Sequence, residues 1–493
     1  MHKIKLKKEP SLELKHKAFD YQLNAVEFVR NKKYAAIFHE QGLGKSVIAI
    51  NIIQDWLKGN KVDTVLVVTK KGLIQNWIDE FNEHTYIKPM ILNSTHSNYC
   101  NVLNSPCRII VTHFEAVGQL KEQLKLMLSV REVAIIIDES AKIKNPNSKL
   151  TKVFFELSDL FVRKIIMTGT PIANRPYDIW SQIFFLDNGE SLGKDFLKFK
   201  KYTDLSNKLD EDDVLRENFE YTVSSIYEKI SEFSIRETKA SGILPDLPEK
   251  KYFDLYVEWE QRQYNKYLEI QKEMKTFVKK NNEIFEDDSS ESLKRLLRLV
   301  QVASNPKLID DEYVTEPGKF EVLVQLLDQI VDRNEKVIIW SCFVENVNWL
   351  YSKLKSYGVV KIHGGISIEQ RNEAVKKFKK DKDVKVLIAT PAAAKEGLTL
   401  TVANNAIYYD RNFALDDYLQ SQDRIHRFSQ TKSCNIYKLI MKDSIDEWID
   451  ELLKSKFLAA KLGQGDITEE EYKHEISYKF GEIVHEILAM GGE

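Results

Sequence analysis

A short glycine-rich segment of this sequence has the composition of a phosphate-binding loop. Residues 41–46 read Gln-Gly-Leu-Gly-Lys-Ser, between an apolar run and a helical pattern at 47–56. Glycines let backbone N–H groups approach a phosphate, and the following helix adds its positive N-terminal dipole. A lysine at this position reaches the β- and γ-phosphates of ATP, and the serine after it ligates Mg²⁺. The segment predicts a nucleotide site built from Gly42, Gly44, Lys45 and Ser46.

One position departs from the full phosphate-loop pattern. That pattern has a glycine five residues before Gly44, and this sequence has His39 there. Taken alone, the segment is also compatible with a surface turn that precedes a helix. Residues 39–46 are called the phosphate loop below.

Two adjacent carboxylates follow an apolar run farther along the chain. Residues 135–137 are isoleucines, and Asp138 and Glu139 come directly after them. An aspartate at a strand end can hold Mg²⁺, and the next carboxylate can orient or deprotonate an attacking water. An isolated Asp-Glu pair also suits the start of a helix, but its place two apolar runs after the phosphate loop favours the nucleotide site. We therefore predict that Lys45, Asp138 and Glu139 carry the hydrolysis of ATP with Mg²⁺.

Two further segments contain side chains suited to a nucleotide. Arg424 and Arg427 are three residues apart, so on a helix they share one face and can clamp a triphosphate. The alternative for this segment is a solvated basic face. Gln22 precedes Lys45 by 23 residues, and its amide can donate to and accept from an adenine edge. The alternative for Gln22 is an ordinary surface residue.

Parallel strands are needed to bring these residues together. Apolar runs alternate with helical patterns in two series, and they are apolar on both faces, as strands covered by helices on each side are. Residues 252–259 add one strand-like run, and 191–235 and 261–308 predict amphipathic helices. The runs of the first series are 34–38, 64–69, 108–112, 134–138 and 164–168, and those of the second are 336–340, 359–363, 386–390, 406–410 and 434–439.

This pattern predicts an α/β fold of two lobes, each a parallel sheet flanked by helices, with helical insertions between the lobes. The expected domains are lobe 1 at 1–190, a helical insertion and linker at 191–245, lobe 2 at 246–457 with a helical segment at 260–310, and a C-terminal helical tail at 458–493.

Composition limits the classes of protein that fit. No apolar run in the 493 residues approaches the roughly 18 needed to span a membrane, so no membrane partner is expected. The four cysteines include no Cys-x-x-Cys pair, which favours reduced thiols and a cytoplasmic location. A formal net charge of −2 counts mildly against nucleic-acid binding, although a motor can follow a phosphate backbone through local basic patches.

The ordered motifs resemble those of superfamily-2 SWI/SNF-type helicase-like DNA-dependent ATPases, in a compact bacterial or phage form. The resemblance runs from residue 21 to about 453. Segments around Arg236, 247–250 and 261–264 resemble those that join the lobes in that family, which favours the SWI/SNF type over other superfamily-2 motors. The matching segments are 21–22 (adenine motif), 42–46 (motif I), 68–80 (Ia), 112–115 (Ib), 138–145 (II), 168–174 (III), 336–341 (IV), 363–365 with Arg371 and Phe378, 390–401 (V) and 420–430 (VI).

The resemblance implies that the two lobes are RecA-like and form an ATPase motor that translocates on or remodels DNA. It also implies a location in a bacterial cytoplasm, or in the host cytoplasm if the protein is phage-encoded. A strand-separating DNA helicase is an alternative. A nucleotide-switched DNA-binding scaffold and an RNA helicase are weaker ones, because the charges for hydrolysis are present and the joining segments are of the SWI/SNF type. The resemblance also implies Gly397 as a nucleotide contact and sequence-independent phosphate contacts from Lys70, Lys71, Thr112, Ser341, Thr390 and Thr399.

Three departures from the family pattern concern coupling more than hydrolysis. Motif II has Ala141 where the family has histidine, so one polar link between the ATP site and the neighbouring motifs is expected to be absent. Residues 413–415 replace the family's Trp-Asn-Pro, and Ser429 replaces a glycine.

Overall fold

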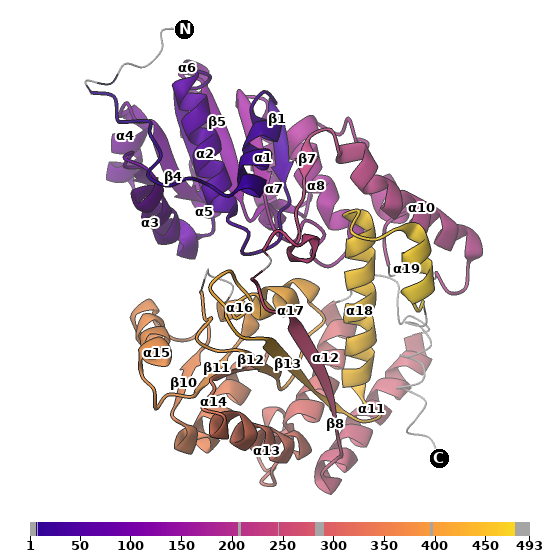
Figure 1. The fold of residues 1–493 in the computed structure, drawn as a ribbon. Coiled ribbons are helices and arrows are strands. Elements are labelled where there is room, and N and C mark those ends of the chain that lie inside the picture. Colours follow the sequence, from indigo (N-terminus) through magenta and orange to yellow (C-terminus); the bar gives the residue numbers. More distant parts are fainter. Residues whose placement is uncertain are drawn as a thin grey trace. The chain divides into compact units, whose positions relative to one another are not determined.

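The computed structural model describes residues 6, 8–205, 209–244, 246–281, 290–394 and 398–478. The chain divides into two compact units, each described here by itself (Figure 1). Lobe 1 comprises Met1–Leu205, Glu217–Pro245 and Ala459–Lys473, and lobe 2 comprises Ser206–Arg216, Asp246–Leu458 and His474–Glu493. The domain boundaries expected from the sequence remain predictions.

Lobe 1 is built on a seven-stranded sheet in the order β3-β4-β2-β5-β6-β1-β7, in which every strand pair is parallel. Its strands are β1 (Tyr34–Ile37), β2 (Thr64–Thr69), β3 (Met90–Leu92), β4 (Ile109–His113), β5 (Val133–Asp138), β6 (Arg163–Met167) and β7 (Ser234–Ile235). Its helices are α1 (Asp20–Val29), α2 (Lys45–Lys58), α3 (Ile74–His84), α4 (His96–Asn104), α5 (Phe114–Gln119), α6 (Lys121–Val130), α7 (Lys149–Ser158), α8 (Trp180–Asp187), α9 (Phe196–Lys201) and most of α10 (Asp213–Ile230).

Lobe 2 has a six-stranded sheet in the order β10-β11-β9-β12-β13-β8, also parallel throughout. Its strands are β8 (Lys250–Val257), β9 (Val337–Trp340), β10 (Val359–Ile362), β11 (Val386–Ala389), β12 (Asn405–Tyr408) and β13 (Cys434–Met441). The remaining helices are α11 (Gln261–Asn281), α12 (Ser290–Ser304), α13 (Gly318–Asp332), α14 (Val344–Lys353), α15 (Ile368–Lys380), α16 (Pro391–Ala394), α17 (Leu415–Gln422), α18 (Ile445–Gly463) and α19 (Glu469–Glu475).

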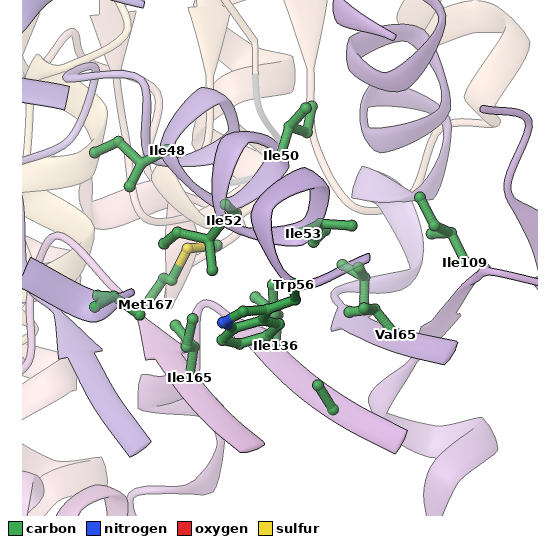
Figure 2. Packing of buried hydrophobic residues seen from close by; sticks show 14 of the residues in the cluster. Ile48, Ile50, Ile52, Ile53, Trp56, Val65, Ile109, Ile136, Ile165 and Met167 are labelled. Atoms are coloured by element: carbon green, nitrogen blue, oxygen red, sulfur yellow. The ribbon is translucent and has the colours of Figure 1, made fainter. Parts of the chain in front are cut away.

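The core of lobe 1 shows why the strands are apolar on both faces. Helix α2 turns one apolar face, with Ile52, Ile53 and Trp56, toward the sheet (Figure 2). Ala134 and Ile136 of β5 belong to this same cluster. Because strand side chains alternate, Ile135 and Ile137 point to the opposite face, and they too are fully buried.

The predicted fold class is confirmed: both lobes are α/β units with parallel sheets and flanking helices. Each of the ten strands expected in the two series is present within one or two residues of its expected position. The strand-like run at 252–259 corresponds to β8, the edge strand of the second sheet. Two short strands, β3 and β7, were not predicted, because three and two residues are too few for a visible alternation of apolar and polar positions.

Two further expectations concern helices and thiols. Among the described residues, no helix is long and apolar enough to cross a membrane. All four cysteines are free, and Cys107 and Cys434 are buried while Cys100 and Cys342 are half-buried.

Candidate nucleotide site

The chemistry-bearing side chains of lobe 1 follow the carboxyl ends of neighbouring strands. The phosphate loop comes after β1, Lys70 after β2, Asp138 ends β5, and Thr168 comes after β6. In a parallel sheet these ends share one edge, which is the usual place for a ligand site. The strand order β2-β5-β6-β1 therefore places these residues along a single edge.

The phosphate loop needs glycine at two positions. Gly42 and Gly44 have φ of 90° and 70°, in the left-handed region that other residues rarely adopt. A Cβ on Gly44 would also lie 2.3 Å from Nε2 of Gln22. Gly44 is the N-cap of α2, so the loop leads directly into the amino end of a 14-residue helix. Ser46 is half-buried in the first turn of that helix, where a serine ligand of Mg²⁺ is expected.

Lys45 is folded back over its own loop. Its Nζ donates hydrogen bonds to the carbonyl oxygens of His39 at 2.9 Å and Glu40 at 3.3 Å, and the side chain is buried. The loop thus holds the ammonium group beside the backbone that a phosphate would approach. Lys45 is where the sequence predicts it.

His39 occupies the position where the phosphate-loop pattern has glycine. The residue is fully buried, and its ring lies 6.3 Å from that of Tyr21. Burial, and then the nearby charge of Lys45, lower the pKa of His39 to about 4. The imidazole is therefore neutral near pH 7 and adds no charge to the loop.

Asp138 is held in place by two donors from a neighbouring segment. Its Oδ2 accepts hydrogen bonds from Nε1 of Trp77 at 2.9 Å and from Oγ1 of Thr69 at 3.2 Å. Burial, and then the charge of Glu139, raise the pKa of Asp138, whereas Trp77 and Lys45 act in the opposite direction. A bound cation would favour the ionised form of this carboxyl and so would lower its pKa.

Trp77 lies in the segment that resembles motif Ia (68–80), and no role for it was predicted from the sequence. Its side chain is 2% exposed on α3 and packs 5.9 Å from the ring of Phe81. A tryptophan in an amphipathic helix is normally interpreted as a core residue, and only the fold shows that its N–H reaches Asp138.

Glu139 follows β5 in an uncommon backbone conformation. Its φ of 58° and ψ of 49° are left-handed, which is unusual for a residue that is not glycine, asparagine or aspartate. The side chain is largely buried, and its Oε2 lies 3.7 Å from Nζ of Lys70. The predicted water-orienting carboxylate therefore forms an ion pair with a predicted DNA contact.

Gln22 lies against the phosphate loop, with both ends of its amide occupied. Nε2 donates to the carbonyl oxygen of Leu43 and to the hydroxyl of Tyr21, each at 3.3 Å. Oε1 accepts from the backbone N–H of Phe19 at 3.0 Å, which caps α1. The expected role of Gln22 in reading adenine remains a prediction.

In lobe 2, the expected helical face with two arginines is not present. Helix α17 ends at Gln422, and Arg424 and Arg427 lie in the tight turns that follow. After Gln422 the regular helical pattern is lost: the N–H groups of Arg424 and Ile425 bond to carbonyls three residues back, although that of His426 still bonds four residues back. The carbonyl of Arg424 accepts from the N–H of Leu400 at 2.8 Å. The expectation of a shared helix face is therefore wrong.

Both arginines nevertheless donate hydrogen bonds to residues of motif V. Arg424 is buried, and its Nη1 donates to the carbonyl oxygen of Leu398 at 3.4 Å. Nη1 of Arg427 donates to Oγ1 of Thr399 at 2.7 Å. Gly397, the predicted nucleotide contact of motif V, lies outside the described residues.

The hydroxyls expected to contact DNA are mostly internal. Oγ1 of buried Thr112 donates to the carbonyl oxygen of Leu92, and Oγ of buried Ser341 donates to the carboxylate of Asp410. Thr390 is buried as well. Thr112 and Ser341 are fully buried here, and their expected phosphate contacts remain predictions. Lys71 is exposed, and Lys70 is partly so.

Comparison with known proteins gives the family. A model of the SNF2-related domain matches residues 21–308, which is more than half of the chain. A model of the helicase conserved C-terminal domain matches residues 318–429. The chain belongs to the SNF2-related family. The resemblance read from the motifs is thereby confirmed.

Several curated proteins are similar along most of this SNF2-related chain. An uncharacterized ATP-dependent helicase of Mycoplasma pneumoniae is 27% identical over 464 residues, which cover 90% of this chain and 42% of that protein. The ATP-dependent DNA helicase DDM1 of Arabidopsis thaliana is 25% identical, covering 92% of this chain and 63% of its own length. The chain thus spans less than two thirds of the length of these relatives. A solved Sulfolobus solfataricus SWI2/SNF2 ATPase core in complex with dsDNA is 24% identical, with 95% of this chain and 99% of that chain covered and a TM-score of 0.44.

Proposed function

We propose that this SNF2-related protein is a DNA-dependent ATPase motor that translocates on or remodels DNA by hydrolysing ATP. The observation that carries the proposal is the shared sheet edge in lobe 1. The glycine-containing phosphate loop with Lys45 and the hydrogen-bonded carboxylate of Asp138 lie there, at the ends of parallel strands. That combination suits a nucleoside triphosphate and a divalent cation.

Mg²⁺ fits the chemistry of the donor set. Asp138 is a half-buried carboxylate, and its two hydrogen bonds, from Trp77 and Thr69, engage Oδ2. Ser46 and Asp138 would hold the ion, which would neutralise charge on the phosphates. The chain's own part is to orient the carboxylate through Trp77 and Thr69 and to keep Lys45 beside the phosphate loop.

For hydrolysis, Glu139 would orient the attacking water and accept its proton. Arg424 and Arg427 would stabilise charge on the transferred phosphoryl group, a role worth about 10³–10⁵ in rate in related reactions. Their part in hydrolysis remains a prediction, for which Arg427→Ala is the direct test. The hydrogen bond that Arg427 donates to Thr399 links this arginine to motif V.

For DNA, Lys70 and Lys71 are the candidates that lie at the surface of lobe 1. Ammonium groups suit phosphate oxygens and carry no base preference, so binding should be largely independent of sequence. A strand-separating helicase is the second candidate, because curated relatives are named ATP-dependent helicases. The expected cytoplasmic location also remains a prediction.

The experiment measures ATP hydrolysis alone and with duplex, forked and single-stranded DNA or RNA. We expect DNA to stimulate hydrolysis several-fold, with an affinity that falls as salt rises. Lys45→Ala should abolish hydrolysis, whereas Lys58→Ala, which removes an exposed lysine at the other end of α2, should not. An active Lys45→Ala variant, or equal stimulation by RNA, would contradict the proposal. Displacement of an annealed strand would favour the helicase.

A further inference from the structure

Lys70 and Glu139 are brought together by the register of two neighbouring strands. In the β2–β5 pair, Val68 lies opposite Ile137. Continuing this register by two residues places Lys70 opposite Glu139, just past the carboxyl ends of both strands. The fold therefore juxtaposes one residue predicted to contact DNA and one predicted to orient water. The register of the sheet therefore places the two residues next to each other.

The two charges form an ion pair that is partly shielded from solvent. Nζ of Lys70 and Oε2 of Glu139 are 3.7 Å apart, and the side chains are 26% and 9% exposed. Within the part of the chain that the structure describes, Glu139 forms its salt bridge with Lys70. The backbone of Glu139 is left-handed at this point (φ of 58°), an uncommon conformation for a glutamate.

We propose that Lys70 is a shared cation that pairs with Glu139 in the absence of DNA and with a DNA phosphate in its presence. DNA binding would then release the carboxylate that must orient the attacking water. This inference rests on the proposed function and names its regulation. It gives DNA a direct route to the ATP site at Glu139, in a chain whose Ala141 lacks the polar side chain that the motif II resemblance leads one to expect.

Thermodynamic linkage makes the proposal testable without hydrolysis. If Glu139 and a DNA phosphate compete for Lys70, removing the charge of Glu139 must strengthen DNA binding. An ion pair of this exposure is worth up to about 1 kcal/mol, so the expected effect is about two- to fivefold in affinity. Neutralising any carboxylate also reduces repulsion of DNA phosphates, so the effect must be compared with that of a carboxylate elsewhere in lobe 1 and must depend on Lys70.

The first measurement is the affinity of a fluorescent duplex for the full chain without nucleotide. Glu139→Gln should bind the duplex about two- to fivefold more tightly than the unmodified protein. Glu156→Gln is the matched control, because Glu156 pairs with Lys121 at 2.9 Å in the same lobe and carries the same charge. In a Lys70→Met background, Glu139→Gln should have no effect. Equal tightening by Glu156→Gln, or tightening that persists without Lys70, would overturn the proposal.

The second measurement is the rate of ATP hydrolysis with and without duplex. Lys70→Met should raise the basal rate about two- to fivefold and reduce the stimulation by saturating DNA, while Lys70→Arg should resemble the unmodified protein. Lys121→Met removes a lysine of similar exposure, 30%, and should change neither rate. An unchanged basal rate in Lys70→Met would refute the pairing even if DNA stimulates the unmodified protein. An absence of stimulation in the unmodified protein would instead reject the proposed function.

Discussion

The hydrogen bond from Trp77 to Asp138 gives a sharp test of how the candidate site is held. Trp77→Phe removes the N–H that lies 2.9 Å from Oδ2 of Asp138 and keeps an aromatic ring in the core. A hydrogen bond to a charged group contributes about 1.5–3 kcal/mol, which corresponds to about ten- to hundredfold in an equilibrium constant. Residues that orient a metal ligand typically contribute 10–100-fold to metal affinity, which agrees with this range. We therefore expect the Mg²⁺ concentration for half-maximal hydrolysis to rise about ten- to hundredfold.

The assay is a Mg²⁺ titration of ATP hydrolysis at a fixed nucleotide concentration, with the unfolding midpoint measured in parallel. Trp56→Phe is the matched control, because Trp56 is also almost fully buried in lobe 1 and loses the same atoms. It lies eleven residues after Lys45 on α2, about 16 Å away by helical rise. Trp77→Phe should lower stability more than Trp56→Phe, because it also removes a hydrogen bond to a carboxylate. If Trp77→Phe kept the normal Mg²⁺ requirement, or Trp56→Phe changed it equally, the anchoring role of Trp77 would be refuted.

Three further changes have defined outcomes. Gly44→Ala should weaken the binding of fluorescent ADP at least tenfold. A side chain at φ of 70° costs about 1–2 kcal/mol, and the added Cβ would collide with Gln22. If a second change, Gln22→Ala, restored binding, backbone strain would be shown to be unimportant. His39 has a folded pKa of about 4, below its unfolded value, so its neutral form is favoured by folding and stability falls as pH drops from about 6.5 toward 4. Between pH 7 and pH 5, the free energy of unfolding in urea should therefore fall by about 2 kcal/mol less in His39→Phe than in the unmodified protein. An equal fall in both proteins would contradict the low pKa. Arg236 makes two 2.6 Å bonds to the carboxylate of Asp466, so Arg236→Ala should make residues 459–473 markedly more sensitive to limited proteolysis, and unaltered cleavage would show that the segment is held by other contacts.

The strands of both lobes could be predicted because their signal is local. A run such as Val133–Asp138 is apolar on both faces, and only a sheet covered on each side accepts such a run. The order of strands within the sheet is not a local property. Edge strand β7, two residues long, pairs with β1 about two hundred positions earlier, and nothing in its sequence indicates that partner.

The candidate site divides in the same way. Lys45 and Asp138 were predictable, because the glycines beside one and the isoleucines before the other determine their chemistry. The helix expected through Arg424 and Arg427 is not formed. The carbonyl of Arg424 instead accepts a hydrogen bond from the N–H of Leu400, a residue of another motif. The sequence also did not indicate that the hydroxyl of Ser341 donates to Asp410, which follows a neighbouring strand, in the interior of lobe 2. Both contacts join segments that are distant in the sequence.

The segment that follows a neighbouring strand also limits the shape of the phosphate loop. Strand β6 lies between β5 and β1, and Gly169 follows it, so motif III comes directly against the loop. A Cβ on Gly169 would lie 2.9 Å from the backbone nitrogen of Gln41, a distance that no side chain could occupy without displacing the loop. A glycine that has no unusual φ of its own is thus required by another segment's backbone. Because Asp138 ends the strand on the other side of β6, any shift of motif III would change the spacing between the phosphate loop and the carboxylate that is expected to hold Mg²⁺.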